Sequence, residues 1–249
     1  MTFKTDGSVH YDGIQNELDT IAFLNTTGRY VDEVVHYGGT TQKADAKAGD
    51  KCISIKHKKG IKNGSYDYAN TSIYNGMFNT HFDKFLSEVK EHRQMPQQLR
   101  EVAVDFMRDD FNNLCNSALE SIDKDALIAM LVDIFSNQSG YDIVINDTNN
   151  KKIHIFQSED HPVWTAIQQG YVPELVSSGR AKSSRKIVFK NGNYTIHTGL
   201  RIRVTSNNGI NAFLGLSKSN KNSQIVVKLQ QDSIAQLVED ANAEVYDYD

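Results

Sequence analysis

The chain has 249 residues, enough for one large domain or two small ones with a sizeable core. Hydrophobic residues make up 39% and charged residues 23%, a composition that excludes an intrinsically disordered protein. No apolar run approaches the length of a membrane-spanning helix, and residues 1–13 lack the apolar segment of a signal peptide. Cys52 and Cys115 are far apart and lack metal-ligand spacing. We therefore expect a soluble cytoplasmic protein with two reduced thiols.

The net charge of −4 argues against a protein coated with nucleic acid, but not against one focused basic cleft. The basic residues are unevenly distributed, with clusters at 56–62, 180–190 and 201–221. Solvated surfaces are the simplest explanation of such clusters, and a focused anion-binding surface is the alternative.

In the first third of the chain, Ile14, Leu18 and Ile21 recur at helical spacing and predict a helix over 11–27. The elements expected after it are a strand at 30–37, short strands near 42–47 and 51–58, and a Gly- and Asn-rich loop at 61–76. The middle of the chain predicts helices at 78–92, 97–122 and 123–135, strands at 141–145 and 152–156, and a short helix after 160. Asp123 and Asp160 are the expected N-caps of the two helices that follow them.

From Lys186 onward the sequence is β-rich, with a hairpin predicted at the Asn191-Gly192 turn. A strand at 224–229 and a terminal helix capped by Asp232 complete the chain. We expect a single α/β domain over 1–249, with a central mixed β-sheet flanked by helices. A helical insert at about 77–138 and a β-rich C-terminal part would be added to this core.

The segment KADAKAGDKCISIKHKKG, residues 43–60, concentrates polar chemistry around a predicted hairpin. A two-residue turn at 49–50 would set Asp45 opposite Ser54, and strand alternation would put Asp45, Ser54 and Lys56 on one face. Directly opposed side chains lie about 5 Å apart at Cβ, and diagonal neighbours about 7 Å apart. A carboxylate, a hydroxyl and an ammonium group would then surround a space the size of a hydrated metal ion.

Such a group of side chains suits phosphodiester hydrolysis. A carboxylate binds Mg²⁺, which polarises the scissile phosphate and lowers the pKa of a bound water. A neighbouring lysine can orient that water and balance charge in the transition state. The competing interpretation is an exposed hairpin with a surface ion pair worth less than about 1 kcal/mol.

A second carboxylate would strengthen the metal-site interpretation, because the hydroxyl of Ser54 is a poor ligand for a divalent metal. Glu17 lies one turn before Ile21 in the first predicted helix and could point toward the hairpin. Taken by itself, Glu17 would be interpreted as a solvated helix acid. Asp50 is the rival of Asp45, but it lies at the tip of the turn.

The order Asp45, then Ser54-Ile55-Lys56, resembles the PD-(D/E)xK nuclease superfamily, in which an acid on one strand precedes (D/E)xK on the next. The segments GGTTQKADA and ISIKHKKG, with DGIQNELD in the first helix, look like the corresponding parts of the MspI-like branch of type II restriction endonucleases, which cut four-base sites. The resemblance covers 11–60 and, more loosely, 194–235. An uncharged polar residue at 54 departs from the superfamily pattern but is similar to this branch.

The resemblance implies a restriction-endonuclease-like core, with its catalytic part at about 8–76, and a role for each motif residue. Asp45 would be the principal Mg²⁺ ligand, with Mn²⁺ able to substitute for the metal. The main-chain carbonyl of Ile55 and, through water, Glu17 would be further ligands. Lys56 would position the attacking water, and Ser54 would take the second motif position.

We expect DNA contacts on both sides of this site. The basic residues after the catalytic strand would meet the DNA backbone, namely Lys58, Lys59 and Lys62. The candidates for base edges in the region at about 185–230 are Arg201, Arg203, Thr205, Ser206, Asn207 and Asn208. An amphipathic edge strand with a polar turn explains these six equally well. Arg180, Lys182, Arg185 and Lys186 are expected on solvated surface, with a loop that orders on DNA as the alternative.

The function implied by the resemblance is that of a type II restriction enzyme in a restriction-modification system of bacterial, phage or viral origin. Such an enzyme is a Mg²⁺-dependent endonuclease that cuts double-stranded DNA at a short palindrome and leaves 5′-phosphates. A palindromic target favours a homodimer, with a monomer as the alternative, and a cognate DNA methyltransferase is an expected partner. The alternatives are a structure-specific or repair nuclease of the same fold, a catalytically inactive DNA-binding module, and an α/β protein without nuclease activity.

Overall fold

The computed structural model describes residues 9–38, 44–58, 66–72, 77–78, 80–179, 183–218, 222–232 and 234–248. The chain forms two compact units, each assembled from separate stretches of sequence. Unit 1 combines the stretches Met1–Tyr66, Val132–Gly170 and Asp232–Asp249, and unit 2 combines Asp67–Leu131 and Tyr171–Gln231. Most of the expected helical insert and the C-terminal β region thus belong to the same unit.

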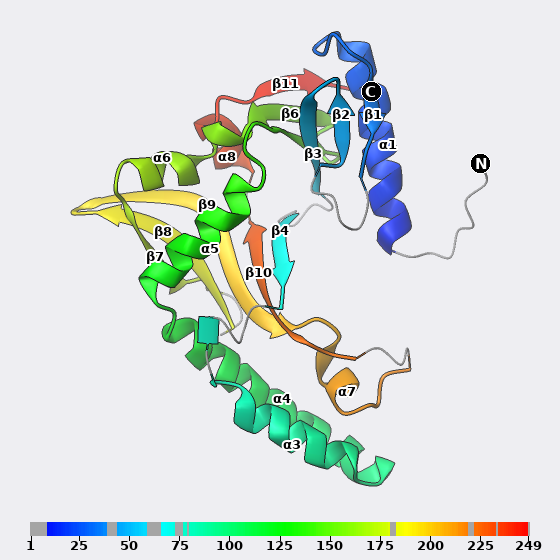
Figure 1. Cartoon of the computed structure of the whole chain (residues 1–249), viewed down its shortest axis with the longest axis vertical. Helices are drawn as coiled ribbons and strands as arrows, with labels where there is room; N and C mark the ends of the chain where they lie inside the picture. The colour runs from blue at the N-terminus through cyan, green and yellow to red at the C-terminus, as the bar shows by residue number, and fades with distance from the viewer. Residues whose placement is uncertain are drawn as a thin grey trace. The chain divides into compact units, whose positions relative to one another are not determined.

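Unit 1 is built on a mixed sheet whose strand order, among the described residues, is β1-β2-β3-β5-β6-β11. Strands β3 and β5 are parallel, and the other neighbouring pairs are antiparallel. Helix α1 runs beside β1 and packs against β1 and β3 (Figure 1). The elements of this unit are α1 (Val9–Thr27), β1 (Val34–His36), β2 (Ala46–Ala48), β3 (Lys51–Lys58), β5 (Asp142–Asp147), β6 (Lys152–Gln157), a 3-10 helix (Ser158–Asp160), α6 (Pro162–Gln168), α8 (Ala235–Asp240) and β11 (Glu244–Asp247).

The face that α1 buries is partly polar. Ile21 is buried in the core of unit 1 as predicted, but Ile14 is 47% exposed and does not belong to the buried stripe. Instead, Asn146 of β5 donates hydrogen bonds from Nδ2 to Asn16 Oδ1 (3.0 Å) and to Thr20 Oγ1 (2.9 Å) of the helix. Because buried amides require partners, these bonds fix the rotation of α1 on the sheet.

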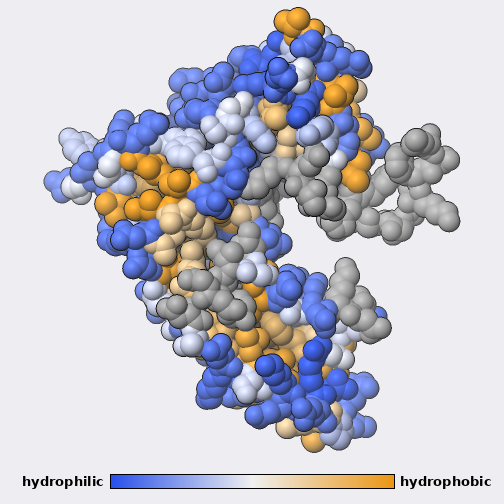
Figure 2. Space-filling model, viewed as in Figure 1, coloured by the Kyte–Doolittle hydropathy of each residue, from blue (hydrophilic) through white to orange (hydrophobic). Residues whose placement is uncertain are grey.

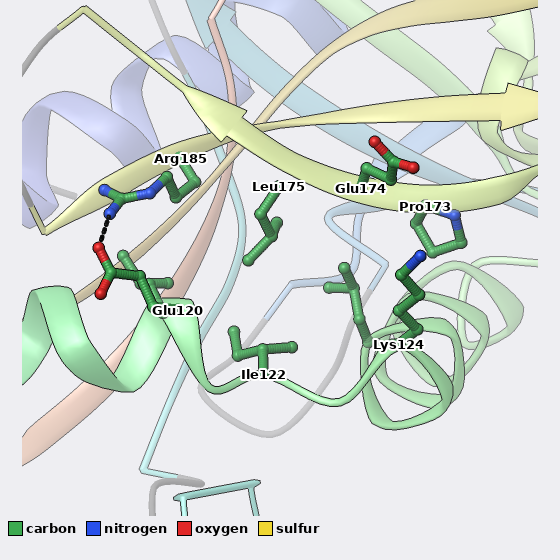
Figure 3. Close-up of a pocket in the computed structure, with 9 residues that line it drawn as sticks. Glu120, Ile122, Lys124, Pro173, Glu174, Leu175 and Arg185 are labelled. Atoms are coloured by element: carbon green, nitrogen blue, oxygen red, sulfur yellow. Dashed lines mark hydrogen bonds and ion pairs between the residues drawn. The ribbon is translucent and has the colours of Figure 1, made fainter.

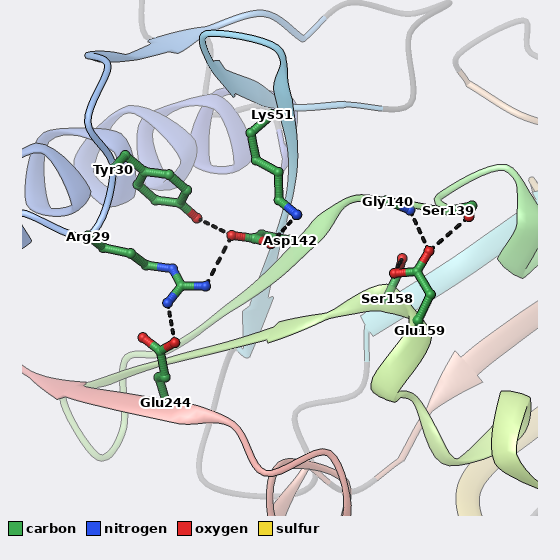
Figure 4. Close-up of polar contacts among 9 residues, drawn as sticks. All are labelled: Arg29, Tyr30, Lys51, Ser139, Gly140, Asp142, Ser158, Glu159 and Glu244. Carbon is green, nitrogen blue, oxygen red and sulfur yellow. Dashed lines mark hydrogen bonds and ion pairs between the residues drawn. The ribbon is translucent and has the colours of Figure 1, made fainter.

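A charged cluster joins four parts of unit 1 around Asp142, whose side chain is 2% exposed (Figure 4). Asp142 receives a hydrogen bond from Tyr30 Oη (2.9 Å) and forms ion pairs with Arg29 Nη2 (3.3 Å) and Lys51 Nζ (2.9 Å). Arg29 also pairs with Glu244 of β11. Burial raises the pKa of the Tyr30 hydroxyl, and the neighbouring charge of Asp142 raises it further. We call these five residues the Asp142 cluster.

Another carboxylate, Glu159, holds the connection between α5 (Lys124–Ser136) and β5 (Figure 4). It accepts hydrogen bonds from Ser139 Oγ (2.8 Å), Gly140 N (2.6 Å) and Ser158 Oγ (3.0 Å). Burial alone would raise the pKa of this carboxyl group, but the bonds from Gly140 and Ser139 lower it below its ordinary value. The ionised form therefore stabilises the turn that leads into β5.

Unit 2 is built on a sheet of order β4-β10-β9-β8-β7 among the described residues. Its helices α3 and α4 lie side by side (Figure 1) and share an aromatic core with α7, formed by Phe82, Phe85, Phe111 and Phe213. Its elements are β4 (Tyr66–Thr71), α3 (Asp83–Arg93), α4 (Gln97–Glu120), β7 (Val172–Ser177), β8 (Ser184–Asn191), β9 (Tyr194–Ser206), α7 (Gly209–Phe213) and β10 (Ile225–Gln231). The division between the units falls within α5 (Lys124–Ser136).

The mixed α/β architecture with a mixed sheet was predicted correctly, whereas several element boundaries were not. The expected strand at 30–37 is only three residues long, and the helix expected from 78 begins at Asp83. Strand β4 lies within the segment expected to be a loop, and β7 and β11 were not predicted at all. The strands that were missed are short and lack a regular alternation of apolar residues.

Two of the three predicted N-caps are wrong. Asp123 caps α5 as expected, because its Oδ1 accepts from the backbone N–H groups of Asp125 (2.6 Å) and Ala126 (3.3 Å). Helix α6 is capped by His161, whose Nδ1 accepts from a backbone N–H in the first turn, and not by Asp160. Helix α8 begins beyond Asp232 without a side-chain cap.

The two cysteines differ in burial, and we expect them to differ in reactivity. Cys115 is fully buried on α4, and burial raises the pKa of its thiol to about 12. Cys52 is only partly buried. Because the thiolate is the nucleophile, iodoacetamide at about pH 8 should modify Cys52 in the native protein and reach Cys115 only after unfolding. Mass spectrometry of alkylated peptides checks this, and equal labelling of both thiols in the native state would contradict it.

No helix among the described residues is long and apolar enough to cross a membrane. Figure 2 shows a surface that is hydrophilic over most of its area in this view, with apolar groups gathered in separate patches.

Candidate active site

The hairpin that carries the predicted site forms with the expected register. Gly49 adopts a left-handed conformation with φ of +56°, which a two-residue turn of this kind requires. Ala48 pairs with Lys51, and Ala46 pairs with Ile53. The residue before Ala46 is thereby brought alongside the middle of β3.

That residue is Asp45, and its contacts confirm the predicted neighbourhood. Its backbone N–H donates to the carbonyl of Ile53 (2.9 Å). Its carboxylate Oδ2 accepts from the backbone N–H of Ile55 (2.7 Å) and from Ser54 Oγ (3.3 Å). Asp45 therefore lies directly beside the Ser54-Ile55-Lys56 triplet.

Two oxygen atoms converge on this edge of β3. The pairing of β2 with β3 ends at Ile53, so that Asp45 covers the next stretch of the edge with its side chain. The N–H of Ile55 points to Asp45, and the carbonyl of a strand residue points to the same side as its N–H. The carbonyl of Ile55 therefore faces the edge where Asp45 lies. The second carboxylate oxygen of Asp45, Oδ1, has no hydrogen-bond partner among the described residues.

Strand alternation places Lys56 on the same face of β3 as Ser54. Ser54 is fully buried, whereas Lys56 is half-buried and lies beside Ile145 of the parallel neighbour β5. The strand therefore fixes the position of the Lys56 backbone, and its side chain projects from the same face as that of Ser54.

Glu17 is held near the same edge by a histidine for which the sequence predicts no role. Its Oε2 lies 3.1 Å from Nε2 of His36, at the end of β1. Gly38 lies between His36 and Asp45. A Cβ atom on this glycine would lie 3.4 Å from both His36 Nε2 and the backbone oxygen of Asp45. The backbone N–H of Gly38 also donates to that oxygen (3.0 Å). His36 and the backbone of Asp45 therefore lie beside Gly38, and Glu17 is linked to this region through His36.

Two amide side chains fix the elements that carry Glu17 and His36. Asn16, next to Glu17, is locked to Asn146 of the sheet. Asn25 of α1 accepts from the backbone N–H of Val34 (2.7 Å) and donates to its carbonyl (3.0 Å). The position of the helix acid is thus set by hydrogen bonds at both ends of this part of α1.

The donors at this edge fit a hard cation that keeps most of its water. Among the described residues, no three His, Cys, Asp or Glu side chains lie close enough together to hold a metal ion by themselves. Mg²⁺ commonly takes only one or two carboxylates and retains several waters. Asp45 Oδ1 and the carbonyl of Ile55 would be the two direct oxygen ligands, and Glu17 would be a third through water. The site fits Mg²⁺ on these terms and does not fit a fully protein-enclosed metal.

The geometry of this edge can be compared with that of known proteins. No protein family, curated protein or solved structure matches the chain. The interpretation of the edge therefore depends on its own residues and contacts.

The residues predicted to contact DNA are only partly accessible. In unit 2, Arg201 is 6% exposed and donates from Nη1 to Ser184 Oγ (3.3 Å). A buried guanidinium cannot reach a base edge, so the prediction for Arg201 does not fit this structure. Arg203, Thr205 and Ser206 are half-buried. Lys59 and Lys62 lie outside the described residues, and of Lys58 only the backbone is described.

Asn207 and Asn208 fasten the loop that precedes β10. Asn207 Oδ1 accepts from the backbone N–H of Gln224 (2.8 Å), and the Asn208 side chain donates to the carbonyl of Asn222 (2.5 Å). These bonds restrict the orientation in which either amide could contact a base. Their observed role is to hold the end of β9 against the start of β10.

An open cavity of about 360 Å³ in unit 2 is a different type of site (Figure 3). Its apolar walls include Leu119 of α4 and Leu175 of β7. Three of the charged groups that line it are already paired, because Arg185 Nη2 contacts Glu120 (3.2 Å) and Glu174 contacts Lys190 (2.6 Å), and Lys124 is a fourth charged residue of the lining. The cavity therefore offers volume and apolar surface, but these paired groups are not poised for catalysis.

His36 is the residue near the site that sequence reasoning missed. It lies in a short strand, and no spacing such as HxH or HExxH marks it. Its relation to Glu17 depends on how α1 packs against β1, which joins residues nineteen positions apart. The only sequence signal was the polar residue at the end of a Val-rich strand.

Proposed function

We propose that this chain is a Mg²⁺-dependent endonuclease that hydrolyses phosphodiester bonds of double-stranded DNA. The observation that carries the proposal is the carboxylate of Asp45, whose Oδ2 accepts from Ser54 and from the N–H of Ile55 and whose Oδ1 has no hydrogen-bond partner among the described residues. A carboxylate oxygen without a partner among the described residues, beside a strand that carries a lysine, suits metal-assisted phosphodiester hydrolysis better than a surface ion pair does.

Each residue has a distinct role in this proposal. Asp45 and the carbonyl of Ile55 would hold Mg²⁺, which would supply charge to polarise the scissile phosphate and to lower the pKa of an attacking water. Lys56, on the adjacent face, orients the attacking water and balances the negative charge that develops on the phosphate. Glu17, positioned by His36, would contact the metal through water. Ser54 keeps Asp45 in place through its hydroxyl and is not a ligand.

The finer assignment follows from the resemblance of residues 11–60 to the MspI-like restriction endonucleases. On that basis the core has the restriction-endonuclease fold, and cleavage is sequence-specific at a short palindrome and leaves 5′-phosphates. A cytoplasmic homodimer acting beside a cognate DNA methyltransferase is the corresponding biological arrangement, with a monomer as the alternative. A repair nuclease on the same fold would differ in cutting at branches or lesions, independent of sequence.

Replacing Lys56 by Ala tests the proposed chemistry. Plasmid DNA incubated with the wild-type protein and Mg²⁺ should yield discrete fragments, and EDTA should prevent their formation. Lys56→Ala should slow cleavage about 100-fold, because it removes one charged group from the transition state. The matched control is Lys152→Ala, an exposed lysine of the same sheet that lies 3.8 Å from Asp247. Fragments formed at the wild-type rate by Lys56→Ala would reject the mechanism.

A catalytically inactive DNA-binding module is the second candidate function. It is favoured by Ser54, because a serine leaves the second motif position without an acid. This serine is also completely buried. This alternative predicts salt-dependent binding of duplex DNA without hydrolysis, even when Mn²⁺ replaces Mg²⁺. Gel-shift and cleavage assays on the same plasmid separate the two functions.

A further inference from the structure

The sheet of unit 2 places basic residues from three strands next to one another on a single face. In the register of β9 with β10, Arg203 pairs with Lys228. In the register of β9 with β8, Arg201 pairs with Lys186. Because directly opposed residues of antiparallel strands share a face, and residues two apart on a strand share it too, all four cations project to the same side. We call these four residues the basic face.

In the described register of β9 with its two neighbours, no acid is opposed to Arg201 or Arg203. The remaining residues opposed to Arg203 and Arg201 in the same register are Ser184 on β8 and Gln230 on β10. Within the described part of the chain, no ion pair involves Lys186, Arg203 or Lys228. Two like charges directly opposed on neighbouring strands destabilise a sheet, so the arrangement of Arg203 and Lys228 is a cost to the free protein.

Arg203 also has an unfilled hydrogen-bond donor. Its Nε is buried and has no partner among the described residues. Buried donors are nearly always paired in folded proteins, so the unpaired Nε shows that the surroundings of Arg203 are short of acceptors. Lys186 is exposed, and Lys228 is half-buried on the strand beside Arg203. The accessible cations thus flank the guanidinium on both sides.

We propose that Lys186, Arg203 and Lys228 form a phosphate-binding strip for the backbone of a DNA duplex. The strip crosses three strands and is therefore about 10 Å wide, with about 6.6 Å between the paired rows. Its cations suit an extended polyanion better than a single small anion. Several positive charges at this spacing need more than one anionic group to neutralise them. It positions the duplex and carries no sequence information, because phosphate contacts are the same for every base pair. This proposal rests on the proposed function, because it takes the DNA substrate of the nuclease as the ligand of the strip.

The salt dependence of DNA binding tests the strip directly. A fluorescently labelled duplex of mixed sequence is titrated with the full-length protein in EDTA, so that no cleavage occurs, over a series of salt concentrations. Each of Lys186→Gln and Lys228→Gln should reduce the slope of log K against log salt by about one, because one phosphate contact is lost. At about 0.1 M salt this corresponds to roughly five- to tenfold weaker binding for each variant. The double variant should lose about two units of slope.

Lys190→Gln is the matched control, because Lys190 lies on the same strand as Lys186 but is already paired with Glu174 (2.6 Å). Its slope should equal that of the wild type. Suppose that the wild type binds and cleaves DNA, but the slopes for Lys186→Gln and Lys228→Gln equal the wild-type slope. This result would overturn the strip and leave the proposed function intact. A wild-type protein that binds no duplex would overturn both. If the two substitutions weaken the binding of double-stranded RNA more than they weaken the binding of duplex DNA, DNA is rejected as the ligand of the strip.

Thermal stability separates a binding role from a structural one. Lys228→Gln removes a like charge opposite Arg203, so the melting temperature of the variant should equal or exceed that of the wild type. Weakened DNA binding together with an unchanged or higher melting temperature supports the strip. A lower melting temperature would show that Lys228 stabilises the fold and would contradict the proposed opposition of charges.

Discussion

Replacing Asp45 by Asn is expected to abolish metal-dependent DNA cleavage, with a loss of at least about 1,000-fold. The amide oxygen of Asn can still accept from the N–H of Ile55, so the hydrogen bond that positions this residue can persist. The negative charge that holds the cation is lost, and a bound metal contributes several kcal/mol to the stabilisation of the transition state, at a factor of ten for each 1.4 kcal/mol. The effect should therefore exceed that of Lys56→Ala. Initial rates of plasmid cleavage over a Mg²⁺ series measure it.

Asp50→Asn is the matched control, since Asp50 is the rival acid on the same hairpin and is exposed at the turn. It should cleave at the wild-type rate. If Asp50→Asn loses activity while Asp45→Asn keeps it, the metal ligand has been assigned to the wrong side of the hairpin. A melting temperature of Asp45→Asn close to that of the wild type is needed to attribute the loss to the site and not to unfolding.

The hairpin could be predicted because its information is local. A left-handed Gly49 determines a two-residue turn, and that turn determines which residues oppose one another. The contact of Asp45 with Ser54 follows from counting along two strands. Lys56 then follows from alternation alone. No long-range packing enters any of these steps.

The surroundings of the hairpin could not be predicted, because they depend on pairings that are distant in sequence. Strand β11 joins the sheet beside β6 some ninety residues later, and α1 packs with a polar face whose partner, Asn146, lies 130 residues from Asn16. Apolar periodicity favoured Ile14 as a core residue, and it is exposed. The position of Glu17 beside His36 follows from that packing and not from helical spacing.

The basic face illustrates the same distinction in unit 2. The sequence shows Arg201 and Arg203 as an alternating pair and suggests base contacts for both. The register reveals that Arg201 is buried beside Ser184, while Lys186 and Lys228, from two other strands, flank Arg203. Basic residues that are widely separated along the chain become one surface only when three strands align.

The Asp142 cluster gives the second large effect, which concerns the stability of unit 1. Asp142→Asn should lower the free energy of unfolding of this unit by about 3 kcal/mol, the lower end of the range for breaking a buried ion pair. The buried carboxylate balances Arg29 and Lys51, and its loss leaves two partly buried cations without their shared partner. Trp164 is the only tryptophan and lies in unit 1, so its fluorescence during urea unfolding reports on this unit.

Glu244→Gln is the control for that measurement, because it removes a carboxylate from the same Arg29 at a site where the side chain is 52% exposed. Exposed ion pairs contribute less than about 1 kcal/mol, so the loss should be much smaller than for Asp142→Asn. The hydrogen bond from Arg29 lowers the pKa of Glu244 below its ordinary value. Its contribution to stability is therefore present above the ordinary carboxyl pKa and is lost as the pH falls through the lowered pKa. The wild type and Glu244→Gln should accordingly differ near neutral pH and converge in acid. Equal losses for the two variants would show that burial does not govern the strength of the cluster.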